Sequence, residues 1–216
     1  MQAATSFKLG NGLFTLSDVS TILNIDYRRV YAWWRRYWHG NNTDKSHFKD
    51  EHKLDFGNLI EFYVVECMVE AGVRPSKVFI AHDVLIEKLK LIKPFVKEEV
   101  LNGIKTDGED LFLEWEEEML TLDRSGQFNF KIINDFIDKI KFSSGVAEQL
   151  WPLGKQKSIV IDPKVQFGQP VIAGTRIQSE VLYLMHEAGE PTGKIASIYD
   201  LTPQQVSEAI EYHSAA

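Results

Sequence analysis

Two arginines and two tyrosines near the N-terminus have the residue types and the spacing needed to bind nucleic acid. Arg28 and Arg35 lie two helical turns apart, and Tyr27 and Tyr31 fall on the same face of a helix. A guanidinium group can donate two hydrogen bonds to guanine in the major groove, and neighbouring arginine and tyrosine side chains can hold phosphates. We therefore predict a DNA-recognition helix, with a surface helix of ordinary solvated arginines as the alternative. The predicted DNA contacts on this helix are Tyr27, Arg28, Arg29, Tyr31 and Arg35.

The segment Leu16–Tyr37 has the residue order of a helix-turn-helix unit, which would position these side chains. Thr15 and Asp18 form a capping pair for the first helix, and Asn24 stands where the turn needs a residue that tolerates positive φ. Asp26 can cap the second helix. Apolar spacing predicts an inward-facing set that consists of Leu16, Val19, Leu23, Ile25, Val30, Trp33, Trp34 and Tyr37.

A polar loop, Gly40–Lys53, follows the predicted recognition helix. Winged helix-turn-helix proteins carry a β-wing at this place in the chain, so the lysines of the loop could contact phosphates. The predicted contacts are Lys45 and Lys49, with Lys53 beside them. A solvated loop without a partner is an equally open interpretation.

The charge distribution restricts any nucleic-acid contact to the N-terminal end. The whole chain has a formal net charge of −7. Residues 1–53 carry eight basic and five acidic residues, whereas residues 54–157 carry 13 and 19 and residues 158–216 carry three and seven. A chain that is basic at one end alone would bind DNA at a defined footprint and would not coat the duplex.

Enzymatic and membrane functions find no support in the residue pattern. The six histidines show no zinc-ligand spacing, and the single cysteine, Cys67, leaves no pair for a disulfide or a structural zinc site. The acidic run at 114–118 lacks a second ligand cluster. No apolar run approaches the ~20 residues that span a bilayer, and the N-terminus lacks an apolar signal core. We expect a cytoplasmic protein with no catalytic residues, metal, cofactor or membrane partner.

We predict a mainly α fold with short β elements, arranged in three parts. Residues 1–100 form a winged helix-turn-helix domain, residues 101–157 a small α+β connector, and residues 158–216 a trihelical, homeodomain-like module preceded by short strands. In the connector, alternating apolar residues in Ile104–Trp115 predict two strands around an Asp-Gly turn. A helical stripe in the connector consists of Ile132, Ile133, Phe136, Ile137 and Ile140.

Turn and capping residues divide the last third of the chain into elements. Residues 158–161 and 171–172 are brief apolar runs bounded by turns, which predicts two short strands. Gly174 permits a backbone conformation that a β-carbon would forbid. Three helices follow, and their predicted starts are Ser179 as a cap, Pro191-Thr192, and Thr202-Pro203.

The most specific motif is G-x-P-V-I-x-G-T-R-I at Gly168–Ile177, followed by I-A-x-x-Y-x-L-T and A-I-x-Y. It resembles a short bacterial domain of unknown function found at the ends of VapB-like antitoxins. The residue order of Phe14–Leu91, including E-A-G-V-R-P-S-K-V, is similar to the MerR-like DNA-binding domains that head VapB-type antitoxins. A MerR effector-sensing domain is not recognisable downstream.

The resemblance implies an antitoxin of a VapBC-like pair that represses its own operon and neutralises a PIN-type ribonuclease toxin. The implied partners are operator DNA, the toxin and a second copy of the chain, since one helix-turn-helix reads only a few base pairs. Arg176 is either an inhibitory cation or a structural one. The predicted toxin or dimer contacts are Ile159, Ile161, Val171, Arg176 and Ile177.

Two other functions stay open on the sequence alone. The chain could be a transcription regulator with a C-terminal dimerisation module and no toxin partner. It could also be an interaction scaffold whose helix-turn-helix no longer binds DNA. A neighbouring gene for a small protein with several spaced acidic residues would favour the antitoxin, and binding to its own promoter would exclude the scaffold.

Overall fold

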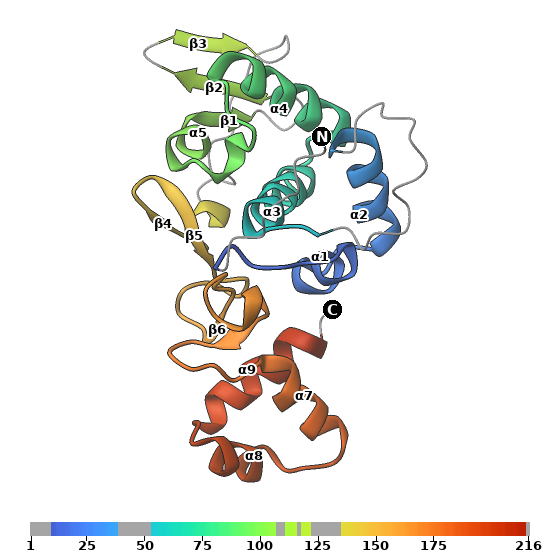
Figure 1. Ribbon diagram of the computed structural model, residues 1–216, viewed down its shortest axis with the longest axis vertical. Coiled ribbons are helices and arrows are strands. Elements are labelled where there is room, and N and C mark those ends of the chain that lie inside the picture. Colours follow the sequence, from blue (N-terminus) through green and yellow to red (C-terminus); the bar gives the residue numbers. More distant parts are fainter. Residues whose placement is uncertain (1–9, 39–52, 107–110, 116–117, 122–134, 215–216) are drawn as a thin grey trace, which may run out of the picture.

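A computed structural model describes residues 10–38, 53–106, 111–115, 118–121 and 135–214 of the chain. This part is mainly helical with short antiparallel strand pairs, which confirms the predicted fold class at that level. Figure 1 shows the N-terminal helices around α3, with the C-terminal helices as a separate layer beneath α1. The predicted wing with Lys45 and Lys49, and the Asp-Gly turn of the connector, lie outside the described residues.

The first two helices begin and end at the residues that the sequence indicated. Helix α1 (Leu16–Leu23) has a capping box in which Asp18 N donates to Thr15 Oγ1 at 3.1 Å and Thr15 N donates to Asp18 Oδ2 at 2.7 Å. Asn24 closes α1 with a φ of 53°. The Asp26 carboxylate accepts the first free N–H groups of α2 (Tyr27–Trp33). A π-helical turn, η1 (Trp34–Trp38), continues α2.

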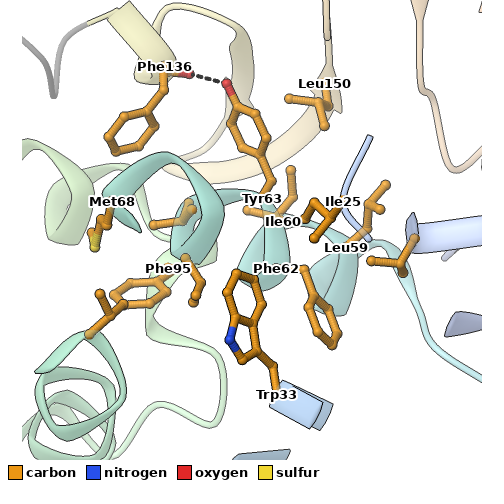
Figure 2. Close-up of a cluster of buried hydrophobic side chains, with 14 of the residues drawn as sticks. Ile25, Trp33, Leu59, Ile60, Phe62, Tyr63, Met68, Phe95, Phe136 and Leu150 are labelled. Atoms are coloured by element: carbon orange, nitrogen blue, oxygen red, sulfur yellow. Dashed lines mark hydrogen bonds between the residues drawn. The ribbon is translucent and has the colours of Figure 1, made fainter. Parts of the chain in front are cut away.

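Helix α3 (Phe56–Glu70) lies at the centre of the main core because it is apolar on nearly every side. Figure 2 shows the side chains of α3 packed against Trp33 of α2 and against Phe95, which follows α4 (Pro75–Leu89) in the chain. The predicted inward residues Leu16, Val19, Ile25, Val30, Trp33 and Trp34 are all buried in this core. Leu23 packs against it at partial exposure, and the side chain of Tyr37 is outside the described set.

The connector contains more strand than predicted. After η3 (Pro94–Val96) and α5 (Glu98–Gly103), β1 (Ile104–Thr106), β2 (Leu111–Trp115) and β3 (Glu118–Thr121) form an antiparallel sheet, and the β1–β2 pairing confirms the predicted strands. The predicted helical stripe is wrong at Ile140, which begins β4 (Ile140–Ser143). Strand β4 pairs with β5 (Val146–Leu150) around Ser144 and Gly145, both at positive φ. This two-residue turn imposes a hairpin in place of the last helical turn.

The last third of the chain forms a small module with its own core, called here the C-terminal module (residues 158–214). Strands β6 (Ile159–Val160) and β7 (Val171–Ile172) lie where two short strands were predicted, and they pair antiparallel. The 3-10 turn η4 (Gln166–Gly168) lies between them. Helices α7 (Ser179–Glu187), α8 (Thr192–Tyr199) and α9 (Pro203–Ser214) follow. The core residues of the module are Ile159, Ile172, Leu182, Ile195, Ala196, Val206, Ala209 and Tyr212.

One predicted cap of this module is wrong. Gln178, and not Ser179, is the N-cap of α7, and it makes no side-chain cap hydrogen bond. Ser179 is fully buried, and its hydroxyl lies 3.2 Å from Pro170 O and 2.9 Å from His213 Nε2. The hydroxyl is therefore used to tie α7 to β7 and α9. The predicted Thr202 cap is confirmed, because Thr202 Oγ1 accepts from Gln205 N at 3.2 Å.

The C-terminal module is attached to the rest of the chain at several points. Leu150 and Ile161 exchange two backbone hydrogen bonds, and Ile161 belongs to the main core. Leu13 N donates to Phe167 O at 2.8 Å. The Phe14 ring packs directly against the backbone of Gly168, where a β-carbon would lie 2.4 Å from the ring. The two parts therefore share buried surface and are not joined by a free linker.

Candidate functional site

Four of the predicted DNA contacts share one face, which is called here the outer face of α2. It consists of Tyr27, Arg28 and Tyr31 of α2 and Arg35 of the following turn η1. Arg28 and Arg35 are exposed, and within the described residues neither guanidinium makes an ion pair or hydrogen bond. Tyr27 is 49% exposed and stacks on the half-buried Tyr31 with ring centroids 6.3 Å apart. Two available cations next to a stacked aromatic pair form a surface that can hold phosphates and base edges.

Arg29 faces the protein, in contrast to Arg28. Its guanidinium lies 2.9 Å from the Glu66 carboxylate of α3 and 4.7 Å from the centroid of the Trp33 ring. Glu66 Oε2, the oxygen nearest to Arg29, is buried and accepts no hydrogen bond of good geometry from the described residues. The attraction between Arg29 and Glu66 is therefore mainly electrostatic. Burial raises the pKa of Glu66, and the Arg29 charge opposes that shift. Arg29 therefore anchors α2 to α3 and is placed differently from the other predicted contacts.

The inner face of α2 fixes the orientation of the outer one. Val30 and Trp33 are buried against the main core, and the Trp33 ring meets Phe79 of α4 edge-on with centroids 6.1 Å apart. The π-helical turn at Trp34–Trp38 interrupts the regular 3.6-residue period beyond Trp33. The spacing that placed Arg35 below Arg28 is therefore altered, although Arg35 stays exposed.

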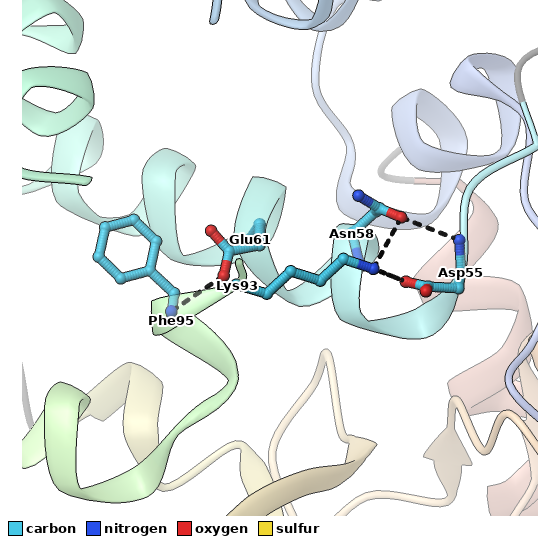
Figure 3. A network of polar contacts seen from close by, with 5 residues as sticks. All are labelled: Asp55, Asn58, Glu61, Lys93 and Phe95. Carbon is cyan, nitrogen blue, oxygen red and sulfur yellow. Dashed lines mark hydrogen bonds and ion pairs between the residues drawn. The ribbon is translucent and has the colours of Figure 1, made fainter. Parts of the chain in front are cut away.

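A buried polar network holds α3 to the elements that follow it. Glu61 has no exposed surface, pairs with His82 Nε2 of α4 at 2.6 Å and accepts a hydrogen bond from Phe95 N at 2.9 Å. Burial raises the pKa of Glu61, and the hydrogen bond from His82 opposes the shift. Figure 3 shows the Phe95–Glu61 contact and, extending away from it, the Lys93 side chain, whose ammonium reaches Asp55 and Asn58 at the start of α3. We interpret this network as structural support for α3, which in turn supports α2.

The structure places some of the predicted toxin or dimer contacts in the core and others at the surface. Ile159 and Ile161 have no exposed surface and Val171 has 1%, so these three side chains are not at the surface of the chain in this fold, and their contact with a partner stays a prediction. Their short strands face the chain's own cores because both sides of the β6–β7 pair are covered. Arg176 is exposed and Ile177 is half-buried. Arg176 makes no side-chain hydrogen bond or ion pair to the described residues.

Glu208 is a functional candidate that the sequence pattern did not indicate. It is buried in α9, accepts Ser158 N at 2.7 Å and Gln204 Nε2 at 2.7 Å, and lies 3.8 Å from Lys157 Nζ. Burial alone would raise the pKa of Glu208, but these hydrogen bonds hold it below its ordinary value. The carboxylate fastens the start of β6 to α9. The spacing of Gln204 and Glu208 was visible in the sequence, whereas the contact with Ser158 was not.

The described residues offer no obvious site for metal or thiol chemistry. They contain no group of three or more His, Cys, Asp or Glu side chains placed to hold a metal ion. Cys67 is half-buried, and burial raises the pKa of its thiol to about 12, so little thiolate forms at neutral pH. None of the helices in this part of the chain is long and apolar enough to cross a membrane.

Comparison with known proteins gives three similarities. Residues 159–213 match the family described as "Protein of unknown function (DUF433)". The chain is 25% identical over 174 residues to "Putative antitoxin VapB45" of Mycobacterium tuberculosis, an alignment that covers 74% of this chain and 71% of that protein. The fold is similar to the crystal structure of Rv2018 from Mycobacterium tuberculosis, with a TM-score of 0.66 at 17% identity over 94% of this chain and 99% of that one.

The chain is thus similar to a protein named as a putative antitoxin and carries a region that matches a family of unknown function. The family match lies within the C-terminal module, while the sequence similarity extends over most of the chain. The structural likeness, at 17% identity, concerns the fold alone. DNA binding, the identity of a toxin and dimerisation are proposals for this chain.

Proposed function

We propose that the chain is the antitoxin of a type II, VapBC-like toxin–antitoxin pair, which binds and neutralises a PIN-type ribonuclease and represses its own operon. The observation that carries the proposal is the similarity to an antitoxin over 174 residues, in a chain whose outer α2 face presents two exposed cations without an ion pair to the described residues. The antitoxin name belongs to that relative. The exposed surfaces of this chain are the reason to propose the same function for it.

DNA binding is proposed for the outer face of α2. Arg28 and Arg35 are exposed, and Tyr27 and Tyr31 stack beside them. Of the three predicted parts of the chain, the N-terminal one alone has a positive charge balance over residues 1–53, with eight basic and five acidic residues. Arg28, which is exposed, is proposed to read a base edge, with the neighbouring side chains of this face holding phosphates. Arg29 is assigned a supporting role because it is paired with Glu66.

Toxin binding is proposed for the exposed part of the C-terminal motif around Arg176. PIN-type ribonucleases are expected to hold a divalent metal with clustered carboxylates, and an arginine offered to these carboxylates can inhibit them. Arg176 is exposed between a glycine turn and the half-buried Ile177 and is not committed to a described partner. These facts favour the inhibitory role of Arg176 over the structural one. A homodimer is proposed because two-fold symmetry extends a short DNA footprint.

The direct experiment is copurification of the chain with the product of the gene beside its own, followed by a ribonuclease assay. We expect a stable complex without ribonuclease activity, and a complex of Arg176→Ala that is weaker or active. Lys194→Ala, at another exposed cation of the same module, is the matched control and should leave inhibition intact.

Two results would redirect the proposal. Binding to promoter DNA without any binding to the neighbouring product would favour a transcription regulator that has a C-terminal dimerisation module and no toxin partner. Light scattering that returns a monomer of 24.8 kDa at micromolar concentration would contradict the dimer. Truncation at Ser158 is a poor test, because Ile161 and Gly168 pack against the N-terminal part of the chain.

A further inference from the structure

A hollow separates the N-terminal end of α2 from the C-terminal module. The first side is formed by the end of α1, the turn and the start of α2, and the second by α7 and α9. Its lining residues are Ser20, Thr21, Asn24, Ile25, Asp26 and Tyr27 on one side and Glu180, Tyr183, Leu184 and His213 on the other. A helix-turn-helix inserts the N-terminal residues of its second helix into the major groove. The C-terminal module therefore stands beside the residues that would enter DNA.

A specific contact holds the module in this place. Tyr212 Oη of α9 donates a hydrogen bond of 2.8 Å to Ile22 O, a carbonyl in the last turn of α1. The Tyr212 side chain is buried, and the neighbouring His213 stacks on Tyr183 with ring centroids 5.5 Å apart. A second, narrower cleft runs between α1, at Ser17, and the module, at Gln178. Among the described residues the module contacts α1 through this buried hydrogen bond and limited packing, whereas its other attachments, at Leu13, Phe14 and Leu150, lie outside α1.

The docked module opposes DNA in two ways. The major groove is about 8.5 Å deep, so a helix that enters it brings the flanking phosphates close to whatever lies beside its N-terminal end. Leu184 is 56% exposed on α7 and would meet that backbone. Residues 158–216 carry three basic and seven acidic residues, and Glu180 lines the hollow itself. Its charge acts on phosphates within a Debye length of about 8 Å at physiological salt.

We propose that the C-terminal module, docked on α1 through Tyr212, stands beside the N-terminal end of α2 across this hollow, where it obstructs the approach of DNA and lowers the affinity of α2 for it, so that tight binding requires the module to move away. This autoinhibitory contact rests on the proposed DNA binding by α2. It also links the two ends of the chain, because anything that holds the module against α1 weakens DNA binding, and anything that releases it strengthens DNA binding.

Locking the module tests the proposal directly. Ser17→Cys and Gln178→Cys place two thiols on opposite sides of the narrower cleft and leave α2 unchanged. A short bismaleimide can bridge them, and Cys67, with a pKa of about 12, reacts slowly at neutral pH. We expect the bridged full chain to bind a labelled duplex of its own upstream region at least tenfold more weakly than the same variant before bridging. Each single-cysteine variant treated with the reagent is the control.

Releasing the module gives the opposite test. Tyr212→Phe removes the hydrogen bond to Ile22 and keeps the ring, and we expect several-fold tighter binding to the same duplex. Tyr199→Phe, in the same module but outside the hollow, is the matched control. Glu180→Gln should also tighten binding, whereas Glu187→Gln on the same helix should not.

The outcomes separate this proposal from the proposed function. Equal affinities before and after bridging, in a chain that binds the duplex, would overturn the autoinhibitory contact and leave DNA binding intact. Equal gains from Glu180→Gln and Glu187→Gln would reduce the effect to overall charge and would also overturn it. If the wild-type chain, the bridged chain and Tyr212→Phe all fail to bind, DNA binding by α2 is wrong, and this proposal with it.

Discussion

The N-terminal helices and the C-terminal module differ in the size of their hydrophobic cores. Among the described residues the main core contains thirty buried apolar side chains, whereas the core of the module contains eight. The main core also encloses a hydrogen-bonded acid–histidine pair, Glu61 with His82, while the module places its buried acid, Glu208, at its edge. A core of eight side chains is small for an independent fold. The module therefore depends on its contacts with the rest of the chain, and its position is the more easily changed.

The largest effect is expected where the main core would lose one half of its buried Glu61–His82 pair. His82→Leu leaves the Glu61 carboxyl buried without this hydrogen-bond partner, at a cost of about 3 kcal/mol of unfolding free energy or more. Denaturant unfolding measures it. The double variant Glu61→Leu, His82→Leu should recover part of the loss, because no unpaired carboxyl remains, but Phe95 N then lacks its acceptor. A single variant as stable as the wild type would mean that the pair does not support α3.

The junction between the two regions should be the next most sensitive place. Gly168→Ala puts a β-carbon 2.4 Å from the Phe14 ring at a φ of +91°, so the ring or the backbone must shift, at a cost of about 2–4 kcal/mol. Gly174→Ala is the matched control, because Gly174 has a φ of +78° and no atom within 4 Å of the new carbon. Its expected cost is about 1 kcal/mol, from backbone strain alone. Equal losses in thermal or denaturant unfolding would show that Phe14 does not clamp the junction.

The edge of the module gives a smaller, pH-dependent effect. Glu208→Gln weakens the hydrogen bonds to Ser158 N and Gln204 and should cost about 1–2 kcal/mol near neutral pH. Because the folded-state pKa of Glu208 is lowered, its contribution is complete above the ordinary glutamate pKa of 4.5 and is lost as the pH falls through the lowered value. Wild type and variant should therefore converge in stability in acid. A difference that grows as the pH falls would contradict this assignment.

The smallest expected change in stability separates two adjacent arginines. Arg29→Ala removes the pairing with Glu66 and the contact with Trp33, and we expect a loss of about 1–2 kcal/mol. Arg28→Ala removes an exposed side chain and should change stability by less than about 0.5 kcal/mol. Thermal unfolding of both variants checks the contrast. If Arg28→Ala is the less stable of the two, the assigned orientation of α2 is wrong.

Local signals in the sequence were sufficient for the elements of both regions. The caps at Thr15 and Asp26, the turn at Asn24 and the Thr202 cap were predictable, because each depends on residues within a few positions. The apolar spacing of α2 also identified Val30 and Trp33 as buried. The paired strands β6 and β7 followed from short apolar runs between turn residues.

The assignments that failed depend on residues far apart in the chain. Periodicity cannot tell that Arg29 meets Glu66 while its neighbour Arg28 is exposed, since only the packing of α2 on α3 decides it. Ile159 was taken for exposed surface because the elements that cover it come later in the chain. Ser179 has the residue type of a helix cap, but its buried hydroxyl forms a hydrogen bond with His213 of α9. The spacing of Ile140 fitted the predicted helix, but the turn at Ser144 places Ile140 in a β-hairpin.

Binding of the full chain to a duplex of its own upstream region, for the wild type and the double variant Arg28→Ala, Arg35→Ala, tests the central claim most directly. Both side chains are exposed and make no described contact, so the fold should survive, which thermal unfolding verifies. We predict that the double variant binds more weakly by at least the ~1–3 kcal/mol expected of one base-reading arginine. Unchanged binding by a folded double variant would contradict the assignment of the outer face of α2 to DNA.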